Sequence, residues 1–294
     1  MTQSLHNLVD RWKSRVMFAV CVGHTVVILG LLILVTGYLL SIGFKSLSLE
    51  FFTQLPTGEV ENPGGMKHAV VGTAILVGLA SLAGIPLGML TGVYLAEYDV
   101  GSWIAGPVRF VADVLAGVPS IVVGILGYEL VVVPMGHYNG WAGALALAFI
   151  MVPIVARTTE EMLRLVPNSY REASIALGAT KAGTILKVVV PSATGSIVTG
   201  VMLAIARVAG ETAPLLFTAL GARFLPVFRE PPPYVHPGDI AEPFPSLTVQ
   251  IFTYATGPYP KQKEQAWAGI LVLIFLIFLL NLAIRFTTRS RKAA

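Results

Sequence analysis

Residues 170–178 read Tyr-Arg-Glu-Ala-Ser-Ile-Ala-Leu-Gly, and Pro191 follows thirteen residues after Gly178. This stretch predicts a short amphipathic helix over Ser169–Leu177, a turn that a glycine permits, and a second helix that leads into an apolar run. The small side chains at positions 173, 174 and 176 would let another protein surface approach closely. From the residues alone, the stretch is either a docking element or a connection that only caps the helices beside it.

The composition around this stretch predicts a membrane protein. Of 294 residues, 55% are hydrophobic and 12% are charged, whereas a soluble domain has roughly 25% charged residues. Because lipid can cover so much apolar surface, we expect an all-α integral membrane protein that carries a solute and does not catalyse a reaction. The net charge of +4 is too small to indicate a nucleic-acid partner.

Six apolar runs are long enough to cross the hydrocarbon core, which takes about 20 residues per helix. They are Val16–Phe44, Ala69–Ala96, Val114–Met135, Gly140–Ala156, Val188–Ala209 and Ala266–Ile284. The first run is too long for the apolar part of a signal peptide and lacks a clear cleavage site, so we expect it to be retained. The sequence therefore predicts a bundle of about six transmembrane helices.

Basic residues predict the orientation, because lysine and arginine gather on the cytoplasmic side of a membrane. They are dense before the first run, between the fourth and fifth runs, and after the sixth. Both termini, residues 1–15 and 287–294, are therefore expected in the cytoplasm of a multi-pass cell-membrane protein. The long cytoplasmic loop would be 157–187 and the long outer loop 210–265. In the outer loop, Pro231-Pro232-Pro233 excludes regular helix, and Leu247–Tyr254 is apolar enough to lie either on the membrane or against the bundle.

The fifth run ends in Arg207-Val208-Ala209-Gly210-Glu211-Thr212-Ala213-Pro214. An arginine in an apolar span is costly and rarely idle. One interpretation is a structural ion pair with Glu211, four residues on, or an arginine that reaches to the outer interface. The other is an anion site, in which the guanidinium binds phosphate oxygens and the carboxylate accepts a hydrogen bond from a protonated anion. Phosphate near neutral pH keeps a proton and sulfate does not, so such a pair could distinguish them.

The sequence shows no other pattern of catalysis or of a bound cofactor. Cys21 is the only cysteine, and the histidines lack metal-ligand spacing. Ser120 has no nucleophile-elbow context, and there is no phosphate-binding loop for ATP. We therefore expect no metal, no cofactor and no enzymatic activity in this chain. If ATP drives it, another chain must bind the nucleotide.

The opening stretch resembles the EAA loop of the permease subunits of ATP-binding-cassette importers. That motif reads Glu-Ala-Ala, three residues, Gly, nine residues and Ile-x-Leu-Pro; here Glu172, Ala173, Gly178 and Pro191 are in register and Ser174 replaces the second alanine. The resemblance implies a type I importer permease fold, with a coupling helix that docks on an ATPase subunit. The residues it assigns to coupling are Glu172, Ala173, Ser174, Leu177, Gly178, Ala179 and Thr180.

A second resemblance narrows the substrate. Gly210–Pro214 after Ala206-Arg207 is similar to the permeases of phosphate importers, as are residues 117–124, 157–161 and 176–181, and together the likeness covers 68–286. It implies a phosphate path that includes Arg207 and Glu211. It also implies ATPase subunits, a second permease subunit and an extracytoplasmic phosphate-binding protein as partners, with lipid around the bundle. Two alternatives stay open: a permease for another oxyanion or solute, and a secondary transporter or channel that works alone.

Overall fold

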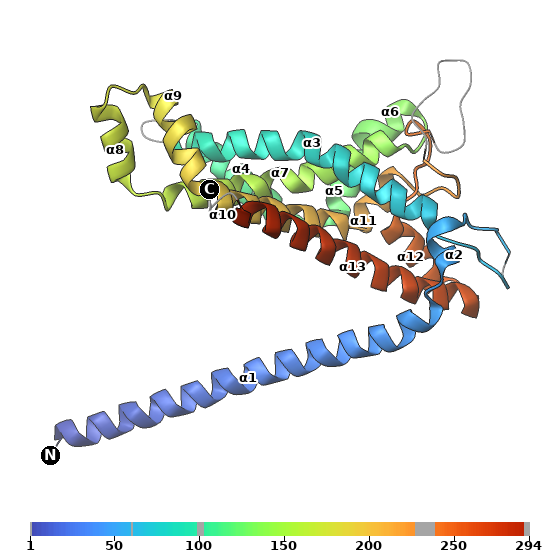
Figure 1. Cartoon of the computed structure of the whole chain (residues 1–294), viewed down its shortest axis with the longest axis horizontal. Coiled ribbons are helices and arrows are strands. Elements are labelled where there is room, and N and C mark those ends of the chain that lie inside the picture. Colours follow the sequence, from blue (N-terminus) through green and yellow to red (C-terminus); the bar gives the residue numbers. More distant parts are fainter. Residues whose placement is uncertain (1, 60, 99–102, 227–238, 291–294) are drawn as a thin grey trace.

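The computed structural model describes residues 2–59, 61–98, 103–226 and 239–290 of a helical bundle (Figure 1). These described residues form no β-strand, apart from an isolated bridge between Leu220 and Phe244. Among the described residues, five helices are long and apolar enough to cross a membrane, and there are six crossings if one sharply bent pair of helices counts as a single span. The five single helices are α1 (Thr2–Ser46), α3 (Lys67–Glu97), α7 (Gly140–Arg164), the continuous helix Lys181–Ala209, and α13 (Pro260–Ser290).

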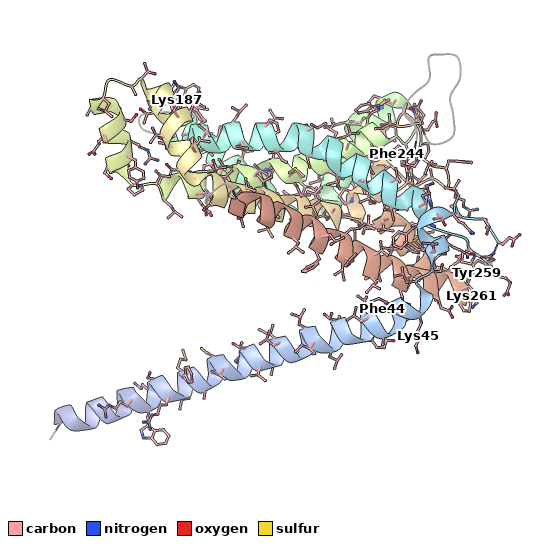
Figure 2. All side chains as sticks on the ribbon, viewed as in Figure 1. Phe44, Lys45, Lys187, Phe244, Tyr259 and Lys261 are labelled. Atoms are coloured by element: carbon pink, nitrogen blue, oxygen red, sulfur yellow. The ribbon has the colours of Figure 1, made fainter. Side chains whose placement is uncertain are left out.

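The ends of the chain agree with the predicted orientation. Figure 1 places the start of α1 and the C-terminal end of α13 at the same end of the molecule as α8 (Asn168–Ala176). In Figure 2, Lys187 lies at that end, while Tyr259 and Lys261 lie at the opposite one. We expect the end with α8 to be the cytoplasmic end, because lysine and arginine residues concentrate there.

The first helix, α1, diverges from the bundle (Figures 1 and 2). It contacts α13 near its C-terminal end, where the Tyr38 and Trp267 rings meet edge-on at 5.7 Å and Gly43 lies against Leu271. The rest of its apolar stretch is not buried within this chain. Its surroundings in the membrane are therefore lipid or another protein chain.

Helices α3 and α7 form the core of the bundle. Gly84, Gly88 and Gly92 on α3 are spaced by one turn and are buried against α7. A Cβ at Gly88 would lie 2.7 Å from the Val155 Cβ and 2.9 Å from the Val152 carbonyl oxygen. Small residues in such a row let two membrane helices approach closely and gain dispersion contacts, which takes the place of a hydrophobic driving force in lipid.

The third predicted span is wrong as a single straight helix. The chain forms α4 (Ala105–Gly117), then α5 (Ser120–Gly127), the π-helical turn η1 (Tyr128–Val132) and α6 (Val133–Met135). The helix axis bends by 104° between Ala105–Gly117 and Ser120–Met135. Proline disfavours helical geometry in the residue before it, and Val118 and Pro119 are accordingly extended. Hydropathy alone does not reveal this break.

The predicted cytoplasmic loop at 157–187 is largely helical. Helix α7 continues to Arg164, two turns beyond the predicted span. On the other side, α9 (Lys181–Thr184), the π-helical turn η2 (Ile185–Val189) and α10 (Val190–Ala209) form one continuous helix. The π turn precedes Pro191, which has no N–H for the helical ladder. Between α7 and α9, α8 matches the amphipathic helix expected at Ser169–Leu177.

The outer segments fold back onto the bundle. They are α2 (Leu49–Thr53) and α12 (Leu247–Thr256), whereas α11 (Ala213–Thr218) packs against α5 inside the bundle. The expected contact of Leu247–Tyr254 with the bundle is confirmed, because the Leu247 amide donates to Thr73 Oγ1 at 2.7 Å and Leu247 is buried. Pro231-Pro232-Pro233 lies outside the described residues.

Replacing Gly88 by alanine is expected to destabilise the α3–α7 contact. The added methyl group meets Val155 and backbone at under 3 Å, and overpacking of this kind costs about 1–3 kcal/mol. We expect a lower melting temperature in detergent for Gly88→Ala. Gly78→Ala is the matched control on the same helix, because a Cβ there meets nothing within 4 Å. Equal melting temperatures for the two variants would contradict the packing described.

Candidate functional site

Arg207 lies at mid-depth in the bundle. Its side chain lines a small pocket with Ile150 and Ile154 of α7, which are roughly 15–20 Å from the outer start of that helix at 1.5 Å per residue. Beyond Arg207 the chain continues outward through α11 to Thr218. The backbone carbonyl of Thr218 accepts a hydrogen bond from the backbone N–H of Asn139, at the start of α7, at 3.0 Å. An arginine that reaches to the outer interface does not fit this depth.

Two interruptions of membrane helices meet beside Arg207. One is the extended pair Val118-Pro119 between α4 and α5; Val118 lines the same pocket as Arg207. The other is Gly210–Thr212, between α10 and α11. The broken helices touch, since a Cβ at Gly124 would lie 2.8 Å from the Pro214 Cα. Interrupted helices leave backbone N–H and C=O groups without intrahelical partners, which makes this depth more polar than the surrounding bundle.

Arg207 and Glu211 are paired only loosely. The distance from Arg207 Nε to Glu211 Oε1 is 3.9 Å, which is too long for a hydrogen bond. The helix ends at Ala209, between the two residues, and the backbone carbonyl of Glu211 accepts a hydrogen bond from Thr248 Oγ1 at 2.8 Å. This pair therefore leaves the planar fork of the guanidinium able to bind another group.

The surroundings of Arg207 place any bound anion at the edge of this chain. The pocket beside Arg207 has a volume of ≈ 10 Å³, about the space of one water molecule, so a phosphate-sized anion cannot enter it. The Arg207 side chain is 54% exposed, however, and that of Glu211 is 14% exposed. An oxyanion on Arg207 would therefore bind at the surface of this chain.

The predicted coupling residues form an exposed surface at the cytoplasmic end. Leu177 is 89% exposed, and Gly178 ends α8 with φ +84°, a left-handed conformation that favours glycine. A groove of ≈ 550 Å³ with largely apolar walls runs beside them. Of the seven residues, five are exposed and two are partly buried: Glu172, Ala173, Leu177, Gly178 and Thr180, and then Ser174 and Ala179.

Arg171 fastens α8 to the rest of the bundle. Its guanidinium donates to both carboxylate oxygens of Glu97 at the end of α3, with the shortest contact at 2.6 Å. It also donates to the carbonyls of Val166 at 2.6 Å and Leu163 at 2.9 Å. The side chains of Arg171 and Glu97 are only 19% and 6% exposed. A buried bidentate pair of this kind fixes direction as well as distance.

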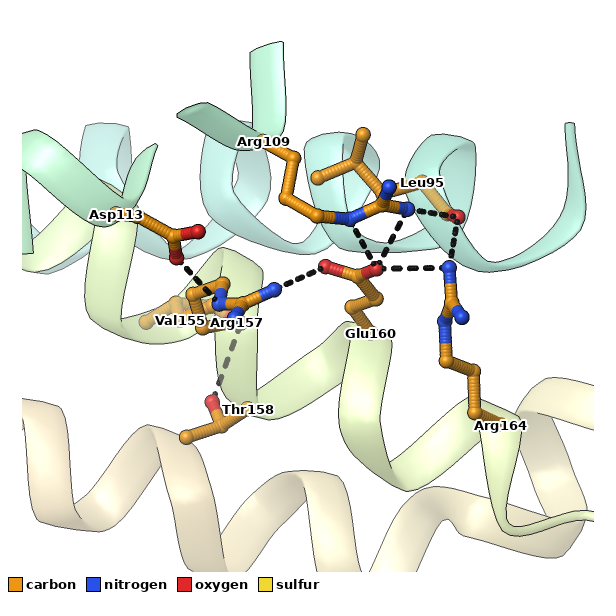
Figure 3. Close-up of polar contacts among 8 residues, drawn as sticks. All are labelled: Leu95, Arg109, Asp113, Val155, Arg157, Thr158, Glu160 and Arg164. Carbon is orange, nitrogen blue, oxygen red and sulfur yellow. Dashed lines mark hydrogen bonds and ion pairs between the residues drawn. The ribbon is translucent and has the colours of Figure 1, made fainter. Parts of the chain in front are cut away.

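A second charge cluster joins α4 to the cytoplasmic end of α7 (Figure 3). Glu160 is 2% exposed and forms ion pairs with Arg109, Arg157 and Arg164 at 2.9–3.1 Å. Arg157 also pairs with Asp113 at 2.8 Å. Three guanidinium groups thus surround one buried carboxylate, which compensates the cost of burying it.

Sequence reasoning missed Glu97 and Glu160 as members of these networks. Residues 158–163 have helical spacing in the sequence, and the spacing of Glu160 from Arg157 and Arg164 is a readable helical signal. This pattern does not show, however, that Glu160 is buried. The pairing of Glu160 with Arg109, and of Glu97 with Arg171, joins helices distant in sequence. No local pattern reveals such pairs.

Comparison with known proteins gives a consistent set of relatives. Residues 84–230 match the family described as binding-protein-dependent transport system inner membrane component. The chain is 42% identical over 250 residues to the phosphate transport system permease protein PstA of Yersinia pestis, covering 85% of this chain and 81% of that protein. It is 38% identical over 227 residues to the probable PstA of Methanocaldococcus jannaschii, covering 77% of each.

A solved structure shares the fold. A chain of the MetNI methionine ABC transporter in an inward facing conformation aligns with a TM-score of 0.60 and 20% identity, covering 76% of this chain and 94% of that one. At this identity the likeness concerns the fold alone.

Removing the carboxylate of Glu97 is expected to release α8. Glu97→Ala leaves the Arg171 guanidinium without its partner, and breaking a buried pair costs about 3–5 kcal/mol. We expect faster tryptic cleavage within residues 164–187 and a lower melting temperature. Glu264→Ala is the control, because its pair with Lys261 is more than half exposed on both sides and such pairs contribute about 0–1 kcal/mol. Unchanged cleavage in Glu97→Ala would show that the pair does not hold α8.

Proposed function

The chain belongs to the PstA family of binding-protein-dependent transport system inner membrane components, and from this premise we propose that Arg207 and Glu211 contact phosphate as it crosses the membrane. The protein is the membrane-spanning permease subunit of an ATP-driven phosphate importer. It is a transport component of the cell membrane. The proposal concerns the residues that contact phosphate. It rests on the position of the Arg207 side chain.

The chemistry of Arg207 suits an oxyanion. Its guanidinium is charged at any workable pH and offers parallel N–H donors to two phosphate oxygens. It sits at mid-depth and is half exposed, so it can offset the anion's charge where the desolvation cost is highest. Polar backbone at the two helix interruptions adds to this, in the way that broken helices form substrate sites in other transporters.

Glu211 supports a choice between phosphate and sulfate. A carboxylate repels a fully ionised anion but accepts a hydrogen bond from one that still carries a proton. Phosphate carries a proton near neutral pH and sulfate does not, and sites that require a hydroxyl discriminate strongly against ligands that lack it. In the structure, Glu211 Oε1 is 3.9 Å from Arg207 Nε, close enough for one anion to contact both side chains.

The exposed surface of α8 is the proposed contact for an ATPase subunit. Small side chains and the exposed Leu177 surround a groove on a helix that Arg171 holds firmly. Hydrolysis of ATP is assigned to that partner chain. A second permease of the PstC type would cover Arg207, and an extracytoplasmic phosphate-binding protein would deliver the anion to the outer end.

Two alternative functions would require different structural features or a different anion selectivity. A permease for molybdate, sulfate or phosphonate would use the same coupling helix, so only the anion selectivity of uptake distinguishes it. A secondary transporter that works alone needs no exposed docking surface. The groove at α8 favours the ATP-driven reading over it.

Arg207→Gln is expected to abolish phosphate uptake while the importer still assembles, because the charge that offsets phosphate is lost. Arg207→Lys should retain a fraction of the uptake, since a point charge replaces the planar fork. Uptake of labelled phosphate and co-purification of the partner subunits are measured together. Lys261→Gln removes an exposed charge at the outer end and should transport normally. Normal uptake by Arg207→Gln would make Arg207 a structural residue.

Glu172→Lys is expected to weaken docking of the ATPase. The side chain is exposed on α8, so the bundle itself should fold and melt as before, while co-purified ATPase and phosphate uptake both fall. Glu59→Lys makes the same charge change at an exposed outer position and serves as the control. Full ATPase recovery and full uptake in Glu172→Lys would exclude this surface as the dock.

A further inference from the structure

One face of α10 carries a row of polar side chains that only Leu203 interrupts, where a helix facing lipid would be apolar throughout. The exposed residues of this helix are Pro191, Ser192, Ser196, Thr199, Leu203 and Arg207. From Ser192 onward the steps are four, three, four and four residues, which places them along one side of the helix. We name this row the α10 polar face (Ser192, Ser196, Thr199, Leu203 and Arg207). It runs roughly 22 Å from Arg207 toward the cytoplasmic end.

A groove follows the middle of this face. Ser196 and Thr199 line it together with Thr158 of α7 and Asn281 of α13, and its volume is ≈ 770 Å³. Ligand pockets in proteins commonly have volumes of about 300–1,000 Å³, so a hydrated anion fits. Helices from three parts of the chain thus each contribute a polar side chain to one groove on the cytoplasmic side of Arg207.

The hydroxyl groups here are arranged to accept hydrogen bonds. Thr199 Oγ1 donates to the Gly195 carbonyl at 2.9 Å, and Thr158 Oγ1 donates to the Ile154 carbonyl at 2.9 Å. Because each hydroxyl proton is already donated to a backbone carbonyl, the hydroxyl oxygens can only accept further hydrogen bonds from groups in the groove. Water, or an anion that carries a proton, can donate to them.

The absence of charge at these four positions also matters for passage. Ser196, Thr199, Thr158 and Asn281 are neutral, so they offer hydrogen bonds without the strong attraction of a second arginine. Conduction requires sites that bind well enough to admit an ion and weakly enough to release it. A charged site at Arg207 followed by neutral sites toward the cytoplasm satisfies both requirements.

We infer that the α10 polar face, with Thr158 and Asn281, forms the cytoplasmic half of the anion path, where hydrated phosphate passes after it leaves Arg207. The opposite wall is the second permease, across a water-filled gap. This inference rests on the proposed function. It adds the route and the residues by which phosphate leaves the membrane.

Cysteine accessibility tests the inference, because Cys21 is the only native cysteine. In a Cys21→Ala parent, Ser196→Cys and Thr199→Cys are made singly, and the complete importer is placed in inside-out vesicles. A charged, membrane-impermeant methanethiosulfonate should modify both positions, block the ATP-driven release of phosphate from the vesicle lumen, and react more slowly when phosphate is present. Thr194→Cys is the matched control, since Thr194 lies on the opposite side of α10 and is partly buried. It should be spared.

The outcomes separate this inference from the function on which it rests. If the Cys21→Ala parent transports phosphate but positions 196 and 199 react only with a lipid-soluble maleimide or not at all, the face meets lipid or dry protein and the inference is overturned. If the parent does not transport phosphate, the proposed function itself fails. Thr199→Val offers a second readout: it should lower uptake, whereas Thr194→Val should not. Equal uptake by these two variants would also count against the path.

Discussion

Hydrocarbon offers no hydrogen bonds, and this single constraint orders the structure around Arg207. Every interrupted helix in a membrane leaves backbone groups that protein or water must satisfy. The chain breaks α4–α5 at Val118-Pro119 and α10–α11 at Gly210–Thr212, and it brings both breaks to the same depth. An arginine beside them is less costly than it would be in an unbroken bundle. The breaks in the helices therefore create a polar centre, and the guanidinium of Arg207 makes it positively charged.

Continuous helix and buried contacts connect the proposed phosphate path to the proposed coupling surface. The helix that starts at Lys181 runs without interruption to Ala209, so it joins the region of α8 directly to Arg207. Ser174 and Thr184 share a hydrogen bond of 2.9 Å across the turn between α8 and α9, and Arg171 ties α8 to α3 through Glu97. A displacement of α8 by an ATPase would thus act on two helices of the core. Bistable packing of helices, rather than a flexible loop, would carry the movement.

Sequence patterns predicted the helices whose formation depends on nearby residues. They did not predict the contacts that depend on segments distant in the sequence. Amphipathic spacing gave α8 within one residue, and hydropathy gave five of the spans. The bend at Pro119 was missed because a window of hydropathy ignores one residue's backbone geometry. The depth of Arg207 was missed because the end of an apolar run was equated with the membrane surface, while α11 continues the crossing. Glu160 and Glu97 needed arginines from other helices, which no local pattern contains.

The most direct test of this account is uptake of labelled phosphate at low external concentration, in cells with and without this chain, under excess sulfate and after ATP depletion. We predict uptake that requires the chain and ATP and that persists in the presence of sulfate. Uptake that is indifferent to the chain would contradict the phosphate path. Uptake that sulfate suppresses would contradict the discrimination assigned to Arg207 and Glu211.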